Sequence, residues 1–292
     1  MAVFILPESA MTIASELAGK LRHVWLRNAL LVLLGLFLLY AAAIAAMLVR
    51  QEALLFYPVK LAADFRFNKP DVIERQIEVP GATLSALHFR QPDAKGLIFF
   101  LHGNAGNLDI WLPSTEFYRR AGYDLFMIDY RGFGKSTGRI ESEAQLHADV
   151  RAAWNSITPE YAGKPIVIYG RSLGSGLAVK LATEVDAAQL ILVSAYSSFV
   201  QLGRDHFPWV PSFATRYPMR SDEWLAQVSE PILLIHGARD PLVNVKHSQQ
   251  IKALRPEAEL LILPEASHND VHEFPAYTKA LSAKLTALAQ SH

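Results

Sequence analysis

Gly170-Arg171-Ser172-Leu173-Gly174 is the most informative segment of the sequence for predicting its fold. It follows residues 165–169, a short apolar run rich in β-branched side chains that is typical of a buried strand. Apolar residues at helical spacing follow it as far as Ala182. A serine with a glycine two residues to either side, between a strand and a helix, is the nucleophile-elbow pattern, because small residues permit a sharp and strained turn. The pattern predicts an exposed, reactive Ser172; a glycine-rich turn with an incidental serine is the alternative.

The composition limits the class of protein. The chain has 292 residues, of which 51% are hydrophobic and 19% charged, so it can form a sizeable core in one large domain or two small ones. Its formal net charge is zero, and we therefore expect no nucleic-acid partner. It contains no cysteine, which excludes disulfides, thiol catalysis and thiolate metal sites.

An apolar run near the N-terminus predicts a membrane anchor. Residues 1–28 are mixed in character, whereas residues 29–49 contain no charged side chain. A helix of this length rises ~1.5 Å per residue and can cross a hydrocarbon core of about 30 Å. We therefore expect an uncleaved, single-pass transmembrane helix over residues 29–49. A cleaved signal peptide is the alternative, because the alanines at 41–43 and 45–46 offer small-residue cleavage sites.

Basic residues on the two sides of this run indicate its orientation. Lys20, Arg22 and Arg27 precede it, and Arg50 and Lys60 follow it. The small excess on the N-terminal side favours a cytoplasmic N-terminus. The rest of the chain is then expected on the non-cytoplasmic side of the membrane.

The rest of the chain has the pattern of an α/β domain. Residues 50–75 are interpreted as a juxtamembrane connector and residues 76–292 as the main domain. Within that domain we expect a hairpin over 77–89, strands at 97–101, 123–129, 165–169, 190–193, 232–235 and 260–263, and helices at 144–157, 173–182 and 277–288. Apolar strands that alternate with helices predict a mostly parallel, twisted sheet covered on both faces.

One segment interrupts this alternation. Residues 196–224 are rich in aromatic residues and proline, and prolines this dense forbid a long regular helix. An aromatic insertion after a central strand predicts a small cap over a ligand pocket at the sheet edge. A loop packed for stability is the alternative.

A reactive serine needs a base that accepts its proton and an acid that orients that base, and in this layout the order is serine, acid, histidine. His268 lies in a loop after the last expected strand and is the candidate base. His272, expected within the following helix, is the fallback. His236 ends a strand beside Gly237 and is expected to support its loop.

Asp240 is the candidate acid. It follows the penultimate expected strand and can approach the far ring nitrogen of His268. Asp222 and Asp270 are its rivals, although Asp270 comes in the wrong chain order. For Asp240 itself, the alternative is a simple turn residue before Pro241.

The oxyanion that forms on acyl attack needs preorganised donors. The backbone N–H of Leu173 is one candidate, and that of Asn104, in the loop His102–Asn107, is the other. His102 precedes this loop and is expected to buttress it. Neither glycine-containing loop has the lysine and spacing of a phosphate-binding loop, and we expect no cofactor and no metal.

Taken together, these motifs resemble those of the α/β-hydrolase superfamily, and more narrowly its membrane-anchored lysophospholipase-like and depalmitoylase-like serine esterases. The likeness covers residues 76–292 and the anchor, and it rests on His102-Gly103-Asn104, residues 129–136, the elbow, His236-Gly237 with Asp240, and Ser267-His268. It implies an α/β-hydrolase catalytic domain with a short cap at 196–224 and a triad of Ser172, Asp240 and His268. The base follows Ala266-Ser267, where the family commonly has a glycine.

The combined interpretation is a membrane-anchored serine hydrolase that cleaves a carboxylic ester or thioester with an apolar acyl group through an acyl-enzyme. Its partners are then a small or lipid-like ester substrate and the membrane. A serine aminopeptidase is the second hypothesis; it requires an acidic pocket, for which Asp205, Asp222 and Glu223 are available. A catalytically silent, membrane-tethered binding module is the third, and the intact set of three reactive residues argues against it.

Overall fold

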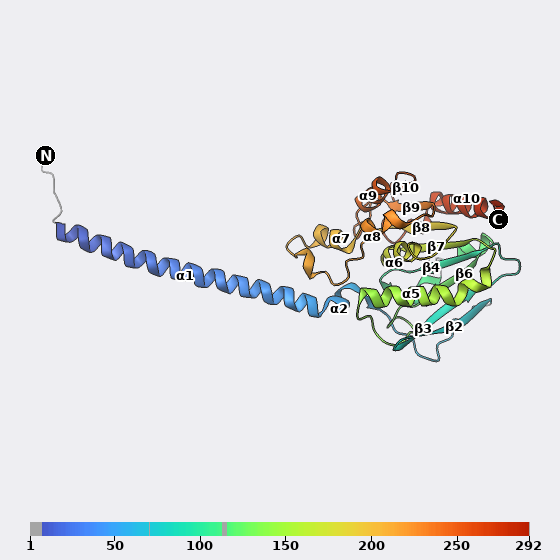
Figure 1. Ribbon diagram of the computed structural model, residues 1–292, viewed down its shortest axis with the longest axis horizontal. Coiled ribbons are helices and arrows are strands. Elements are labelled where there is room, and N and C mark those ends of the chain that lie inside the picture. Colours follow the sequence, from blue (N-terminus) through green and yellow to red (C-terminus); the bar gives the residue numbers. More distant parts are fainter. Residues whose placement is uncertain (1–7, 70, 113–115, 292) are drawn as a thin grey trace. The chain divides into compact units, whose positions relative to one another are not determined.

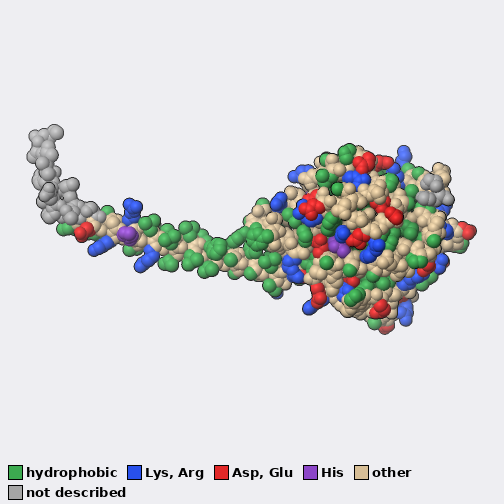
Figure 2. Space-filling view, viewed as in Figure 1, with side chains coloured by type: hydrophobic (Ala, Val, Ile, Leu, Met, Phe, Trp, Pro, Cys, Tyr) green, Lys and Arg blue, Asp and Glu red, His purple; other side chains and the backbone are tan. Residues whose placement is uncertain are grey.

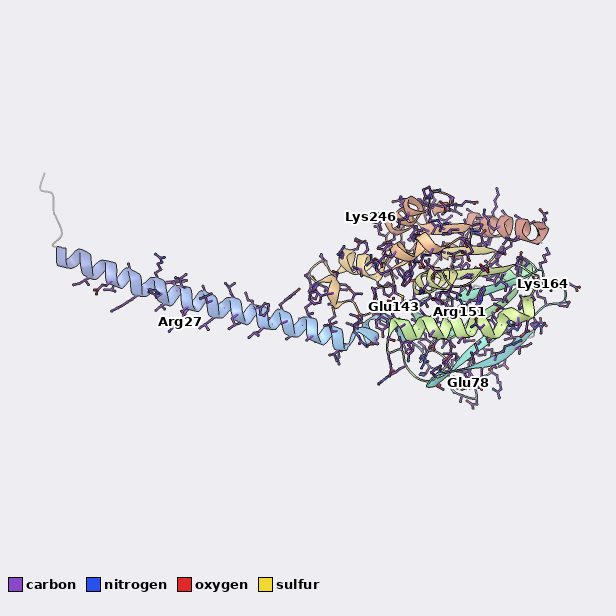
Figure 3. All side chains as sticks on the ribbon, viewed as in Figure 1. Arg27, Glu78, Glu143, Arg151, Lys164 and Lys246 are labelled. Atoms are coloured by element: carbon purple, nitrogen blue, oxygen red, sulfur yellow. The ribbon has the colours of Figure 1, made fainter. Side chains whose placement is uncertain are left out.

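The computed structural model describes residues 8–69, 71–112 and 116–291, and the chain divides into two compact units at Arg50 and Gln51 (Figure 1). The first unit contains helix α1 (Glu8–Val49). From Glu16 to Val49 this helix is long and apolar enough to cross a membrane, judged by its length and composition. Hydrophobic side chains cover its C-terminal part (Figure 2), and Arg27, labelled in Figure 3, is the last charged residue before that part.

The second unit is built on an eight-stranded sheet with the order β10-β9-β8-β7-β4-β6-β3-β2. Its strands are β2 (Val72–Val79), β3 (Ala82–Phe89), β4 (Leu97–Leu101), β6 (Asp124–Ile128), β7 (Ile166–Arg171), β8 (Gln189–Val193), β9 (Ile232–Gly237) and β10 (Glu259–Leu263). Strand β3 runs antiparallel to both of its neighbours, and all other neighbouring strands are parallel. The predicted fold class, a mostly parallel sheet of the α/β-hydrolase type, is confirmed. A separate two-stranded sheet pairs β1 (Tyr57–Pro58) with β5 (Ala105–Gly106).

Helices cover both faces of the large sheet. Successive residues of a strand point to opposite faces, so a strand that is apolar throughout presents apolar side chains to both layers of helices. In β4, Phe99 belongs to one hydrophobic cluster, whereas Ile98 and Phe100 belong to the other. The Phe99 cluster contains residues of α5 (Glu143–Ile157), α6 (Leu173–Ala182) and α9 (Lys246–Leu254). The opposite cluster contains residues of α3 (Leu108–Trp111), α4 (Glu116–Arg120) and α10 (Pro275–Ser291). Central strands are therefore buried on both sides, which explains their continuous apolar sequence.

Most expected elements are present, with ends shifted by one or a few residues. The expected hairpin is formed by β2 and β3, and Gly81 between them has a φ of 77°, a conformation that favours glycine. Helix α9 was missed by the sequence analysis. His272 was expected in the terminal helix, which is wrong: it lies in the short 3-10 turn Val271–Glu273, and Pro275 begins the helix after it.

The expected connector, residues 50–75, is built into the domain. It begins with α2 (Gln51–Leu55). The side chain of Gln51 donates a hydrogen bond from Nε2 to the carbonyl oxygen of Ala214 at 2.8 Å. Its Oε1 accepts a hydrogen bond from the backbone N–H of Arg216. The compact unit therefore starts at Gln51, upstream of the expected boundary at residue 76.

The insertion at residues 196–224 contains α7 (Phe199–His206), α8 (Ser221–Trp224) and a 3-10 turn between them. Tyr196 and Tyr217 are fully buried and fix it to the domain. Three aromatic side chains in its middle are exposed: Phe207, Trp209 and Phe213. The insertion thus combines packed ends with an apolar surface.

The turn between β7 and α6 requires glycine at two positions, because α6 begins directly against the backbone of β4. A Cβ atom on Gly174 would overlap the carbonyl oxygen of Leu101, and one on Gly170 would overlap the carbonyl oxygen of Gly174. Leu101 and Gly170 are direct partners in the β4–β7 pairing. Side chains at either glycine would therefore push the helix away from the sheet.

We expect Gly174→Ala to lower the free energy of unfolding by about 1–3 kcal/mol, because the added methyl group has no space. Gly203→Ala, in α7, is the matched control: nothing lies within 4 Å of the added methyl group. Since alanine favours a helix more than glycine does, the control should raise stability by about 0.5–1 kcal/mol. Urea unfolding of both variants measures the difference, and equal stabilities would contradict the close packing of α6.

Candidate active site

Ser172 connects β7 to α6 in a backbone conformation that few residues other than glycine adopt. Its φ is 52° and its ψ is −117°. Such strain persists only where the surroundings enforce it. The Ser172 N–H donates to the carbonyl oxygen of Val193 in β8 at 2.9 Å, which holds the turn on the sheet. The serine therefore stands at the carboxyl end of β7 and at the N-terminal end of α6.

Three of the predicted side chains come together at this edge of the sheet. His268 Nε2 lies 3.1 Å from Ser172 Oγ, and His268 Nδ1 lies 2.6 Å from Asp240 Oδ2. A carboxylate can only accept, so Nδ1 carries a hydrogen and donates it to Asp240. The other ring nitrogen is then free to accept from the serine hydroxyl. The three residues follow β7, β9 and β10, whose carboxyl ends meet at the same sheet edge.

Asp240 is held as an ionised carboxylate. Its Oδ1 accepts from the backbone N–H groups of Leu242 at 2.9 Å and Val243 at 2.8 Å. Burial opposes ionisation, but the interactions with His236, His268 and the N–H of Val243 outweigh it and hold the pKa of Asp240 well below its usual range. The carboxylate is therefore negatively charged throughout the neutral pH range.

The loop that carries Asn104 passes next to the serine. A Cβ atom built on Gly103 would lie 3.6 Å from the Cβ atom of Ser172. In the described part of the chain, the backbone N–H groups of Asn104 and Leu173 have no hydrogen-bond acceptor. Both groups are therefore available to donate to a ligand oxygen.

A buried histidine and a buried aspartate lie beneath this loop. His102 Nδ1 donates to the carbonyl oxygen of Gly103 at 2.6 Å, and its Nε2 lies 3.7 Å from Asp129 Oδ1. Burial lowers the pKa of His102 to about 4 and raises the pKa of Asp129 to about 7. At pH 5–6 the histidine is consequently neutral and the carboxyl is protonated. His102 supports the loop, as expected from the sequence.

Arg171, which the sequence analysis did not single out, joins the elbow to the loop of His268. Its Nη2 donates to the carbonyl oxygens of His268 at 3.1 Å and Asn269 at 2.9 Å. The guanidinium also lies 5.2 Å from the ring centre of Trp111. A charged residue at the end of a buried strand requires such partners, and this was the available signal in the sequence.

The rival histidines have other contacts. His236 Nδ1 lies 2.7 Å from Ser248 Oγ and its Nε2 lies 2.8 Å from the carbonyl oxygen of Val243, so it braces the Asp240 loop. His272 Nδ1 lies 3.4 Å from an Arg171 nitrogen.

The rival aspartates are also engaged elsewhere. Asp270 Oδ1 accepts from the backbone N–H of Ser267 at 2.6 Å, as in a local turn. Asp222 accepts from Arg220 at 2.8 Å. Among the residues that the structure describes, no group of three or more His, Asp or Glu side chains is arranged to hold a metal ion.

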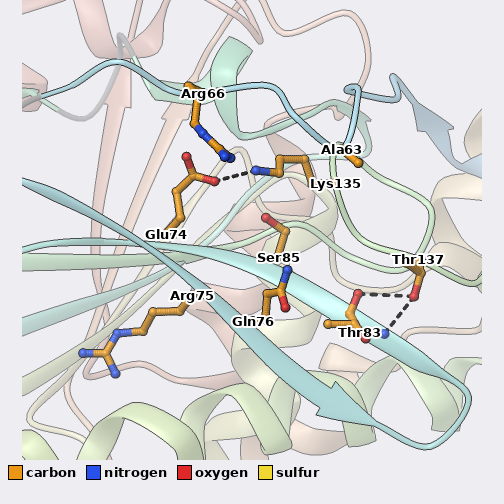
Figure 4. A pocket seen from close by; sticks show the side chains of 9 residues that line it. All are labelled: Ala63, Arg66, Glu74, Arg75, Gln76, Thr83, Ser85, Lys135 and Thr137. Carbon is orange, nitrogen blue, oxygen red and sulfur yellow. Dashed lines mark hydrogen bonds and ion pairs between the residues drawn. The ribbon is translucent and has the colours of Figure 1, made fainter.

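A polar groove of about 590 Å³ lies along β2 and β3 (Figure 4). Its lining includes Arg66, Arg75 and Lys135. Lys135 forms an ion pair with Glu74 at 2.5 Å, and Arg75 forms one with Glu160 at 2.6 Å. Ser172, His268 and Asp240 do not line this groove. It is therefore separate from the candidate active site.

The buried pair predicts how stability depends on pH. Asp129 ionises near pH 4 when unfolded but near pH 7 when folded, so unfolding releases a proton between these values and this carboxyl makes the fold less stable as pH rises. His102 acts in the opposite sense between about pH 4 and 6.5, because only its unfolded form is protonated there. In Asp129→Asn only the histidine contribution remains. The stability of this variant relative to wild type should rise by up to about 1.4 kcal/mol per pH unit between pH 4 and 7.

Chemical unfolding at each pH measures this difference. Asp109→Asn, which removes an exposed carboxylate from α3, is the control and should follow the wild-type curve. Parallel curves for wild type and Asp129→Asn would contradict the raised pKa of Asp129.

Comparisons with known proteins agree with this architecture. The protein family described as serine aminopeptidase, S33, matches residues 92–220. Alpha/beta hydrolase domain-containing protein 17B of Xenopus tropicalis is 31% identical over 203 residues, which cover 67% of this chain and 68% of that protein. The human protein of the same name is 31% identical over 198 residues, covering 65% of this chain and 66% of that protein.

Among solved structures, an esterase of Pyrococcus furiosus matches with a TM-score of 0.64 at 20% identity, over 80% of this chain and 99% of that protein. At this identity the likeness concerns the fold. The strand order, the elbow and the sequence relatives together show that the chain belongs to the α/β-hydrolase superfamily of serine hydrolases, in its depalmitoylase-like branch.

Proposed function

We propose that this chain is a serine hydrolase that cleaves a carboxylic ester or thioester with an apolar acyl group. The observation that carries the proposal is the hydrogen-bonded series from Ser172 Oγ through His268 to Asp240, with distances of 3.1 and 2.6 Å. In this series Ser172 is the nucleophile, His268 the general base and Asp240 the acid that orients it. Membership of a hydrolase family supports the same assignment.

The proposed reaction has two halves. Ser172 Oγ attacks the carbonyl carbon, and its proton passes to His268 Nε2 while the carbonyl electron pair moves to oxygen. The N–H groups of Asn104 and Leu173 donate to this oxyanion. When the C–O or C–S bond breaks, His268 returns the proton to the leaving alcohol or thiol. Water then repeats the sequence on the acyl-enzyme, which releases a carboxylic acid and restores the serine.

The insertion supports an apolar acyl group. Exposed Phe207, Trp209 and Phe213 offer an apolar surface. His206, in the same insertion, lies 2.9 Å through Nε2 from the carbonyl oxygen of Leu242, two residues after Asp240. The aromatic segment therefore borders the loop of the proposed acid, where a cap that contacts an acyl chain is useful.

The aminopeptidase alternative is less well supported, because it requires an acidic side chain that is free to bind an amine. Asp222 and Glu223 both pair with Arg220, at 2.8 and 2.7 Å. Asp205 lies 3.3 Å from His247 Nε2. A silent binding module has no use for the aligned triad and is disfavoured for that reason.

Helix α1 supports a further part of the proposal, in which residues 29–49 anchor the protein in a membrane. The excess of basic residues before this run favours a catalytic unit on the non-cytoplasmic side. An anchor of this kind raises the local concentration of a substrate dissolved in the same bilayer. It therefore increases the apparent affinity without any additional contact in the active site.

Ser172→Ala should lower kcat for a p-nitrophenyl ester by about 10⁴-fold or more, because the nucleophile is removed. His268→Ala should cost a similar factor and Asp240→Asn somewhat less. The double variant of Ser172 and His268 should be no worse than either single variant, because the residues act as a unit.

Two controls accompany these variants. Ser156→Ala, on α5, removes a hydroxyl outside the proposed site and should leave kcat unchanged. His272→Ala should have a mild effect. Full turnover by Ser172→Ala would show that the nucleophile is another residue. A large loss of kcat in His272→Ala, together with a small loss in His268→Ala, would show that His268 is not the base.

The anchor makes a separate prediction, which compares the full chain with one that begins at Gln51, the first residue of the catalytic unit. Both should hydrolyse a short soluble ester at equal rates. On long-chain esters embedded in phosphatidylcholine vesicles, the shorter chain should be at least about tenfold slower, since its effective substrate concentration is lower. Equal rates on vesicles, or a mature protein cleaved near residue 43 or 46, would rule out the tether.

A further inference from the structure

The segment of residues 55–61, which we call the strap, lies along the loop that carries Asn104. Strand β1 of the strap pairs in parallel with β5 of the loop. The Tyr57 N–H donates to the carbonyl oxygen of Asn104 at 2.8 Å, and the Val59 N–H donates to the carbonyl oxygen of Gly106 at 2.9 Å. The backbone of the strap therefore fixes two carbonyl groups of the loop.

Two side chains of the loop bind back to the strap. Asn104 Nδ2 donates to the carbonyl oxygen of Leu55 at 3.1 Å, and Asn107 Nδ2 donates to that of Val59 at 3.0 Å. Asn104 is thus bound to the strap through both its side chain and its carbonyl group. Its own N–H has no acceptor among the described residues, which leaves it for a ligand.

The strap is itself fixed to parts of the domain outside this loop. Phe56 is buried and its ring packs edge-on against Tyr217, with 5.2 Å between the ring centres. Gly134 donates to the carbonyl oxygen of Val59 at 3.1 Å and accepts from the N–H of Leu61 at 3.0 Å. A support that is held independently can determine the position of the loop beside it.

We propose that the strap positions the oxyanion hole, with the N–H groups of Tyr57 and Val59 as its positioning groups. The loop has glycine on both sides of Asn104, at Gly103 and Gly106, so its own backbone constrains it little. Hydrogen bonds to the strap remove this freedom and hold the Asn104 N–H where the oxyanion forms. The inference rests on the proposed function, because it concerns the same reaction.

Catalysis requires that the Asn104 N–H be placed accurately relative to the oxyanion. A donor contributes to catalysis only where it meets the oxyanion at hydrogen-bonding distance, and a displacement of about 1 Å costs about 100-fold in rate. The substrate's acyl and leaving groups do not depend on this donor for binding. Loss of the strap contacts should therefore reduce kcat and leave KM nearly unchanged.

The test uses the full chain with Tyr57→Pro and Val59→Pro, each of which removes one N–H donor from the strap. The matched controls Tyr57→Phe and Val59→Ala change the side chains, both exposed, and keep the N–H. With a soluble p-nitrophenyl ester, each proline variant should show a kcat lowered 10- to 100-fold and a KM within about twofold of wild type. The controls should remain within twofold in both. A lower unfolding midpoint with an unchanged kcat indicates a purely structural strap and overturns the proposal.

Labelling with a fluorophosphonate provides the second measurement, because its phosphoryl oxygen occupies the oxyanion position. The labelling rate of Ser172 should fall in parallel with kcat in the proline variants. A wild type that is not labelled at Ser172 overturns the proposed function and the positioning role together. A labelled wild type with equally fast proline variants overturns the positioning role alone. If a proline variant does not fold, Asn104→Ala, which keeps the backbone N–H, adds no charge and loses the Nδ2 donor to Leu55, takes its place with the same expected loss.

Discussion

The left-handed backbone of Ser172 is the constraint on which the other features of the catalytic unit depend. With a φ of 52° the chain reverses from the end of β7 into α6 within a single residue. The helix can then begin directly beneath the carbonyl oxygen of Leu101, where only glycine fits at position 174. The same approach brings the loop after β4 next to the serine. Strain at one residue thus places the proposed nucleophile, a helix N-terminus and two N–H groups that have no acceptor among the described residues within one small region.

Two buried aspartates near this region show how local donors decide the charge of a carboxyl group. Asp240 accepts two backbone hydrogen bonds and lies against two histidines, and it is ionised despite its burial. Asp129 accepts from the N–H of Leu108 at 3.1 Å, its second oxygen has no partner in the described structure, and burial raises its pKa to about 7. The first arrangement suits an orienting acid, and the second a structural group that remains uncharged at mildly acidic pH.

Periodicity and chain order predicted much of this arrangement from the sequence. The apolar runs predicted the central strands because these strands are buried on both faces. The chain order of serine, aspartate and histidine, each just after a strand, selected the three residues that the structure brings together. Contacts between distant segments could not be predicted in this way. The pairing of Tyr57 with Asn104 leaves no local pattern, and residues 50–75 therefore resembled a connector. His272 was assigned to a helix because the turn before Pro275 was not recognised.

The proposed reaction requires a covalent acyl-enzyme at Ser172, and mass spectrometry of the digested protein can detect this intermediate on its peptide. Wild-type protein is mixed with excess p-nitrophenyl ester of a medium-chain fatty acid, quenched in acid within the first turnovers and digested. We expect a mass increase of one acyl group on the peptide that contains Ser172, at up to one group per chain, which disappears as the substrate is exhausted. Turnover without any acylated peptide, or acylation of a different residue, would contradict it.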